Sequence, residues 1–264
     1  MSVIPLSYLD LLAAAGLVLV LAGLSLRMAL GITGDLLVAA LRTGVQLLLV
    51  GLVLRALFAN AHLGWVTLIA IAMLLVAGRE VWARQKHPAR GVQGFALGTG
   101  AMFVSSFALT VFALLVIVQP APWYTPQYSV PLLGMVLGNT MSAVALGLDR
   151  LNESALNHRA SIEARLSLGH SWLEAIAASR REAARIAMLP TITAMAAAGL
   201  VSLPGMMTGQ ILSGTPPIEA VKYQILIMFL IAAGSGFGSF LAISLGSRLL
   251  FDERHRLRLE RLRG

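Results

Sequence analysis

Amide, guanidinium, phenol and thioether side chains interrupt several long apolar stretches of this sequence. Gln210 follows Met206 by four residues, so the two side chains would share one face of a helix. Tyr223 follows after a short link. Polar groups in apolar surroundings cost free energy unless they are paired, so each is a candidate for binding a ligand. The candidates are Arg42, Gln46, Met135, Asn139, Gln210, Tyr223 and Gln224.

Two positions leave alternatives open. Arg42 and Gln46 lie four residues apart on one helical face, and Arg42 is about two turns from a span end. Arg42 could extend to lipid headgroups, or it could face the bundle interior and pair with carbonyls or with an anionic group while Gln46 lines a cavity. Asn139 could bond across helices, or it could line a pathway with Met135 and Ser142.

The segment 203–214, LPGMMTGQILSG, contains a proline and three glycines in an uncharged apolar region. A proline removes one helical hydrogen bond and clashes with the preceding turn, which predicts a break over residues 200–203. Thioethers suit flexible packing and bind soft ions such as Cu(I), whereas harder metal ions prefer oxygen or imidazole. The methionines are therefore interpreted as part of a gate that repacks. The gate residues are Pro204, Gly205, Met206, Met207 and Gly209.

Composition identifies the elements that must position these groups. The 264 residues are 58% hydrophobic and 12% charged, with a mean hydropathy of +0.82. These values indicate an integral membrane protein. The chain has no cysteine, which excludes disulfides and thiolate metal sites. Its first residues, MSVIPLSYLD, lack the basic region of a signal peptide, so the first apolar run is expected to be a retained span.

We predict an all-α polytopic membrane protein with about seven spans, a single transmembrane domain over residues 1–264. The spans are expected at 6–26, 36–57, 63–78, 94–118, 129–148, 190–213 and 221–247. Most arginines and lysines then fall on one side, in the loop 79–93, the insert 149–189 and the tail 248–264. The positive-inside rule makes this side the cytoplasm and places the N-terminus outside. Anionic lipid headgroups account for the net charge of +8, and no nucleic-acid partner is expected.

The insert 149–189 lies between the fifth and sixth spans and is rich in helix-forming residues. Ile162 and Leu166, then Leu173 and Ile176, recur at helical spacing. Gly169 separates the two pairs, so we predict two short amphipathic helices with a bend at this glycine. Chains of this length rarely fold alone, so the insert is expected to lean on the membrane or on a partner.

The insert resembles the coupling loop of ABC-transporter permeases, which carries a Glu-Ala-Ala…Gly…Leu-Pro pattern. Here the pattern reads Glu163-Ala164, Gly169 and Leu189-Pro190, with Arg165 in place of the second alanine. The segments LRTGVQLLLVGLVL (41–54), PLLGMVLGNTMSAVALGLDRL (131–151), RLSLGHSWLEA (165–175) and GLVSLPGMMTGQILSGTPPIEAVKYQILIMF (199–229) are similar to FetB-type permeases over essentially the whole chain. That family is implicated in bacterial iron export and, in plants, in aluminium tolerance.

The resemblance implies a permease of the bacterial inner membrane, paired as a homodimer with a separate ATP-binding subunit and carrying a metal ion. The residues that would couple to this subunit are Glu163, Ala164, Gly169 and Trp172. ATP and Mg would belong to the partner, since no G-x-x-x-x-G-K-[ST] loop occurs in the chain and no cofactor of its own is expected. The metal-binding residues, if any, stay unknown, because the five histidines are scattered. A nucleotide-sugar or lipid cargo, or a membrane scaffold without transport, remain alternatives.

Overall fold

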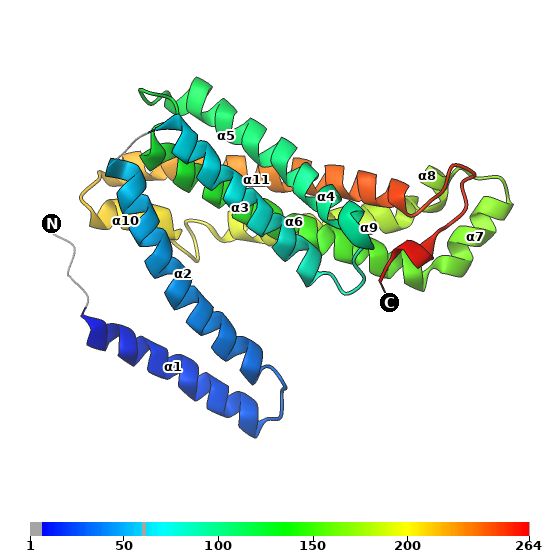
Figure 1. The fold of residues 1–264 in the computed structure, drawn as a ribbon, viewed down its shortest axis with the longest axis horizontal. Coiled ribbons are helices and arrows are strands. Elements are labelled where there is room, and N and C mark those ends of the chain that lie inside the picture. The colour runs from blue at the N-terminus through cyan, green and yellow to red at the C-terminus, as the bar shows by residue number, and fades with distance from the viewer. Residues whose placement is uncertain (1–6, 60–61, 264) are drawn as a thin grey trace.

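The computed structural model describes residues 7–59 and 62–263, and the described residues form helices joined by short connections, with isolated bridges but no β-strand. The chain is therefore an all-α polytopic membrane protein, as predicted. Figure 1 shows the long helices running side by side, with α1 starting at one end and the C-terminal tail at the other. The helices are α1 (Tyr8–Arg27), α2 (Thr33–Ala59), α3 (Leu63–Arg84), α4 (Gly91–Met102), α5 (Ala108–Phe112), α6 (Pro126–Asn157), α7 (Arg159–Ser167), α8 (Trp172–Ala175), α9 (Ala177–Ala197), α10 (Gly205–Leu212) and α11 (Pro217–Leu249). Two π-helical segments, Phe103–Phe107 and Ala113–Val118, flank α5, and a 3₁₀ turn covers Leu259–Arg261.

Six segments within the described residues are long and apolar enough to cross a membrane: Leu9–Arg27, Thr33–Ala59, Leu63–Arg84, Gly91–Val118, Pro126–Asn157 and Pro217–Leu249. The predicted span 190–213 is not among them, because it is divided between the end of α9 and α10. The count of seven is therefore not confirmed. The predicted first residue of the first span, Leu6, lies outside the described residues.

Two predicted span ends were too early. Helix α3 continues past Gly78 to Arg84, and α6 continues past Leu148 to Asn157. The added residues include Arg, Glu and Ala, which favour helix whether or not lipid surrounds them. The spans thus extend beyond the apolar segment and carry charged side chains on their last turns.

Helices α6 and α11 pack against each other at the centre of the bundle, where α11 carries Gly234 and Gly238. A Cβ atom placed on Gly238 would lie 2.5 Å from Cγ2 of Thr140, and one on Gly234 would lie 2.8 Å from Cγ1 of Val136. Small residues at this spacing let helix backbones approach closely in membranes. The GSGFGS segment therefore serves packing within the bundle.

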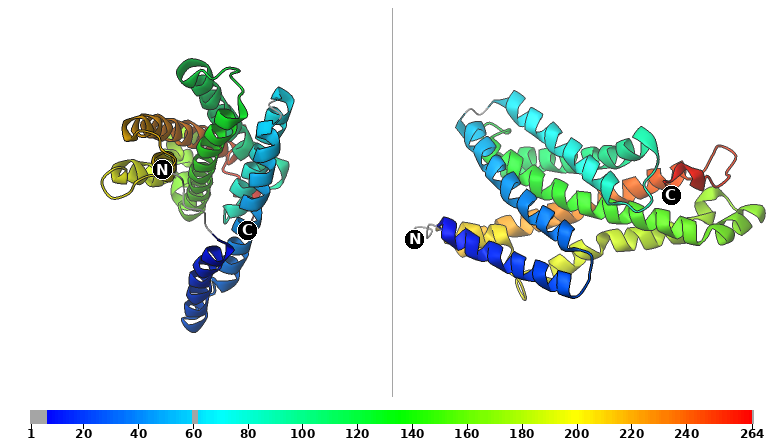
Figure 2. Two further views of the ribbon diagram at one scale, coloured as in Figure 1. Left: turned by 90° about the vertical axis from the view of Figure 1, so that its left-hand side faces the viewer. Right: turned by 60° about the horizontal axis from the view of Figure 1, so that its bottom comes forward.

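Helix α1 and the start of α2 project away from the other helices, as Figure 1 and the left view of Figure 2 show. Ser25 and Thr33 join the two helices of this hairpin through a hydroxyl pair at 2.9 Å. At the other end of α2, Leu57 is buried in a small cluster with Val66 and Val130. Most remaining side chains of the hairpin are apolar and exposed, which suits contact with lipid.

The insert and the C-terminal tail share one apolar core. Ile162 and Ile176 of the insert are buried with Phe251 and Leu262 of the tail. The tail is also pinned to the loop after α3, since the backbone N–H of Arg263 donates to the carbonyl of Pro88 at 2.9 Å. The chain's own tail thus buries part of the insert's apolar face, whereas Leu173 of the same face stays 45% exposed.

Candidate functional site

A cleft of about 900 Å³ opens between α2, α3 and α6. Arg42 of α2 donates from Nη2 to Oε1 of Glu80 on α3 at 2.6 Å, and Nε of Arg84 lies 3.6 Å from the other carboxylate oxygen. Gln46 and Asp35 of α2 also line the cleft. The space is therefore polar on the α2–α3 side and apolar along α6.

Arg42 follows the second of the two predicted courses: it lies in the cleft that Gln46 also lines, and its anionic partner is a carboxylate on the neighbouring span. Glu80 was missed as a site residue since the predicted helix ended at Gly78, leaving Glu80 in a loop. Two adjacent charges, Arg79 and Glu80, marked the end of the apolar run but not the end of the helix. The signal that could have found the pair was Glu80 itself, an acid two residues beyond the predicted end of one span, on the same side of the membrane as Arg42 of the preceding span.

A second, smaller pocket of about 290 Å³ lies at the other end of the bundle, between α6, α10 and α11. It brings together four of the predicted residues, Met135, Met206, Gln210 and Tyr223. The Oε1 atom of Gln210 is buried and has no hydrogen-bond partner among the described residues. A buried amide oxygen without a partner costs about 1–3 kcal/mol, so it is an acceptor available to a ligand or to water.

Two further predicted residues lie outside both spaces. Gln224 is buried in α11, with 8% of its surface exposed, and its Oε1 atom also lacks a partner within the described part of the chain. Asn139 is exposed on α6, and its Nδ2 donates to the carbonyl of Met135 at 2.8 Å. Asn139 therefore bonds within its own helix and not across helices.

The predicted break before Pro204 is present. Helix α9 ends at Ala197, and α10 begins at Gly205 with Pro204 as its N-cap. Between them Gly199 adopts a φ of +81°, which only glycine enters easily, and its N–H donates to the carbonyl of Ser202 at 2.9 Å. Gly199 thus turns the chain here, although it was not among the predicted gate residues, whose glycines are Gly205 and Gly209.

Met207 of α10 is half-buried, next to Met206 in the smaller pocket. Leu200 and Val201 of the break are 89% and 87% exposed. The backbone N–H groups of residues 199–202 all donate within the loop or to Ala197, so the loop presents exposed apolar side chains and not unpaired donors.

The insert turns sharply at Gly169, whose φ is +88°, between α7 and α8. Leu168, the residue before it, is 80% exposed, which places an apolar side chain at the tip. Glu163 is exposed beside Ala164 and pairs only with Arg159 at 2.9 Å among the described residues. Leu168 was not among the predicted coupling residues.

Trp172, also predicted as a coupling residue, is half-buried. Its ring lies 5.7 Å from that of Phe251 in the tail, measured between centroids. Trp172 therefore contacts its own chain.

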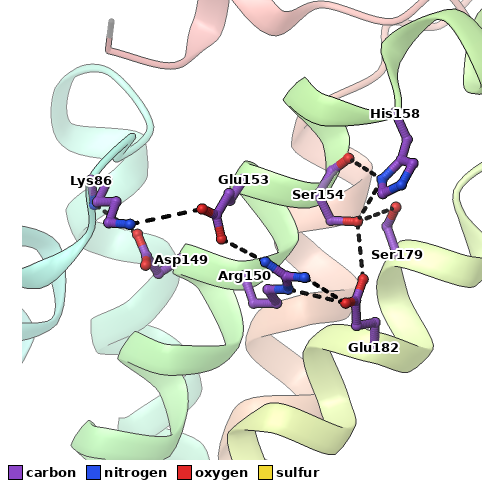
Figure 3. A network of polar contacts seen from close by, with 8 residues as sticks. All are labelled: Lys86, Asp149, Arg150, Glu153, Ser154, His158, Ser179 and Glu182. Carbon is purple, nitrogen blue, oxygen red and sulfur yellow. Dashed lines mark hydrogen bonds and ion pairs between the residues drawn. The ribbon is translucent and has the colours of Figure 1, made fainter.

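A polar network clamps the insert to the spans (Figure 3). Arg150 of α6 donates to Glu182 of α9 at 2.6 Å and to Glu153 at 2.7 Å. The hydrogen bond from Arg150 holds the pKa of the Glu182 carboxyl below its usual range. Ser154 adds a bond to Ser179 at 2.9 Å, so α6 and α9 are joined by several polar contacts at one level.

The same network reaches the loop after α3. The backbone N–H of Lys86 donates to Asp149 at 2.7 Å, and Asn152 donates to the carbonyl of His87 at 2.9 Å. The insert, the loop and the start of α9 thus form one connected unit. Within residues 7–59 and 62–263, no three His, Asp or Glu side chains gather as a metal site would require.

Long apolar helices with polar spaces between them and a folded insert at one end define a multi-pass membrane protein. The chain belongs to the uncharacterised protein family UPF0014, whose family description matches residues 8–251. It is 39% identical over 230 residues to a UPF0014 membrane protein of Synechocystis, covering 86% of this chain and 87% of that protein.

Two relatives carry more specific names. The probable iron export permease protein FetB of Escherichia coli is 31% identical over 259 residues, 96% of each chain. The Arabidopsis thaliana protein ALUMINUM SENSITIVE 3 is 31% identical over 248 residues, 92% of this chain and 88% of its own. No solved structure matches the chain. A relative named as a permease points to a transporter and not to an enzyme.

Proposed function

We propose that this chain is the membrane permease subunit of an ABC transporter, powered by a separate ATP-binding subunit that docks on the insert 149–189. The observation that carries the proposal is the exposed tip at Leu168 and Gly169, held on a unit that Arg150 and Glu182 fasten to α6 and α9. An apolar side chain that is 80% exposed on a fixed support is suited to fill a groove in a partner.

The cargo we propose is iron or a related metal ion, moved outward. The name of the Escherichia coli relative supports this cargo. Oxygen ligands suit such ions, and the polar cleft offers the carboxylates of Asp35 and Glu80 and the amide of Gln46. A cation entering the cleft would compete with Arg42 for Glu80, which would couple cargo binding to the contact between α2 and α3.

The outward half of the pathway would run through the smaller pocket. Gln210, Tyr223 and Met135 line it, and the break at Gly199 to Pro204 gives α10 a place to move. We assign Met206 and Met207 to packing during this motion. Gln224 and Asn139 are proposed as further contacts once the helices shift.

The complete transporter would hold two copies of this chain and two ATP-binding subunits, which bind ATP and Mg. The chain would lie in the bacterial inner membrane with its N-terminus outside and the basic tail in the cytoplasm.

Purification with the candidate ATP-binding subunit and reconstitution into vesicles test the proposal. We expect ATP-dependent metal movement and an ATPase rate that rises with iron(II), with no rise for UDP-sugars. Leu168→Ala should abolish the coupling, and the matched variant Leu173→Ala, on the far side of Gly169 and 45% exposed, should retain most of it. A complex that assembles but moves no metal would reject the cargo. Failure of the two chains to associate would reject the ABC assignment.

A further inference from the structure

A pocket at the tail end of the bundle is not used by the proposed pathway. Its volume is about 730 Å³, and it lies where α4 begins and α11 ends. One wall of the pocket is apolar, formed by Ala96 and Leu97 of α4 and Leu245 of α11. These residues lie within the first two and the last two turns of two candidate spans, so the pocket sits close to the boundary between lipid and water.

The rim of the pocket is basic. Arg248 is exposed on the last turn of α11, and its side chain forms no ion pair or hydrogen bond with the rest of the described chain. Arg261 reaches in from the tail, where its Nη1 donates to the carbonyl of Leu249 at 2.7 Å. His255, held at a φ of +58°, lines the same rim.

The acidic residues at the rim leave this basic character in place. The carboxylate of Asp252 is already occupied by Arg256 at 2.8 Å and Arg258 at 3.2 Å. Glu253 is exposed and is the remaining acid of the lining. The lining of the pocket therefore holds two arginines and a histidine against this one remaining acid.

We propose that this pocket binds an anionic phospholipid, with the phosphate between Arg248 and Arg261 and the acyl chains along Ala96 and Leu245. Basic pockets at the ends of membrane helices recognise lipid headgroups through charge, and apolar walls facing the bilayer accept the chains. A soluble anion would use the rim alone and would leave the apolar wall unexplained, which is why a lipid is the occupant. The site is independent of the proposed transport function.

A bound lipid would touch the insert and the tail as well as two spans. The pocket is also lined by Trp172 of the insert and Phe251 of the tail. The lipid would therefore join the insert to the ends of α4 and α11.

Native mass spectrometry of the purified chain from mixed micelles tests the site. We expect phosphatidylglycerol to be retained over phosphatidylcholine, and Arg248→Gln to lower that retention about fivefold, the effect of one basic residue at a membrane surface. Arg254→Gln removes the same charge from the exposed tail outside the pocket and should leave retention unchanged.

Three results would overturn the proposal. Equal losses in the two variants would show a general effect of tail charge. Equal retention of the two lipids would show no headgroup recognition, and displacement of phosphatidylglycerol by inorganic phosphate would show a site for a soluble anion. Size-exclusion profiles of both variants establish that they are folded, and Arg248→Lys should restore most of the retention.

Discussion

Gly238→Ala tests the packing at the centre of the bundle. The added Cβ would lie 2.5 Å from Cγ2 of Thr140 and 2.8 Å from Oγ of Ser105. Neither neighbour can withdraw easily. Thr140 is fully buried, and Ser105 is held by a hydrogen bond from its hydroxyl to the carbonyl of Ala101 at 2.8 Å. The two helices must therefore separate or the side chains must leave their preferred rotamers.

The expected cost follows from comparison with Gly236, two residues earlier on the same helix. A Cβ there would meet Met188 at 3.8 Å, an ordinary contact. Both alanine variants gain about 1 kcal/mol in helix propensity. Overpacking of a filled core costs about 1–3 kcal/mol, so Gly238→Ala should be less stable than Gly236→Ala by about that amount.

Unfolding by sodium dodecyl sulfate in mixed micelles, followed by circular dichroism, measures the difference. The second-site change Thr140→Ser removes Cγ2 and should recover part of the loss in Gly238→Ala, with the contact to Ser105 still in place. Equal stability of the Gly238→Ala and Gly236→Ala variants would refute the close approach of α11 to α6. So would a Thr140→Ser change that gives no recovery.

Three other predictions concern the charged and exposed groups. Glu80→Gln leaves Arg42 with no acidic partner among the described residues, and because the Arg42 side chain is 47% exposed the loss in the same titration should be at most about 1 kcal/mol, with no further loss when Arg42→Gln is added; an additive double variant would contradict the pair. Gly169→Ala forces a side chain into a φ of +88° and should lower both the melting temperature and stimulation of the ATPase partner, whereas Leu168→Ala should lower stimulation alone. The backbone N–H of Arg256 holds the pKa of Asp252 at about 2, below its ordinary 3.8. Because the pKa of Asp252 is lower in the folded tail, its stabilising effect is complete above the ordinary pKa and is lost as the pH falls toward about 2. Protease cleavage of the tail should therefore rise as the pH falls through this range. In Asp252→Asn the cleavage should not change with pH over the same range.

The sequence predicted features that depend on local chemistry. Apolar runs located the spans, Pro204 marked the broken segment, and Gly169 marked the turn of the insert. Each is set by a property of a few neighbouring residues. Hydropathy, by contrast, reports where lipid ends and not where a helix ends, so α3 was cut short and Glu80 was lost from the site.

Contacts between residues far apart in the chain could not be predicted from the sequence. Arg150 and Glu182 are 32 residues apart, and nothing in their surroundings marks them as partners. The fold of the tail depends on Phe251 and Leu262 meeting Ile162 of the insert. An arginine-rich segment such as 248–264 is expected to be a solvated tail from its sequence. Only the structure shows that its apolar residues, Phe251 and Leu262, are buried in a core shared with the insert.

The packing divides the molecule into a part that can transmit motion and a part that can respond to it. Helices α6, α9 and α11, with the insert and the tail, share buried clusters and the network around Arg150. A push on the tip at Leu168 would move this unit as one body, because the ion pair of Arg150 with Glu182 and the shared apolar core join the insert to α6 and α9. The hairpin of α1 and α2 has far fewer buried contacts, and α10 follows a broken segment. Relative motion must therefore fall at these places, and the pair between Arg42 and Glu80 is the polar contact that spans the first of them.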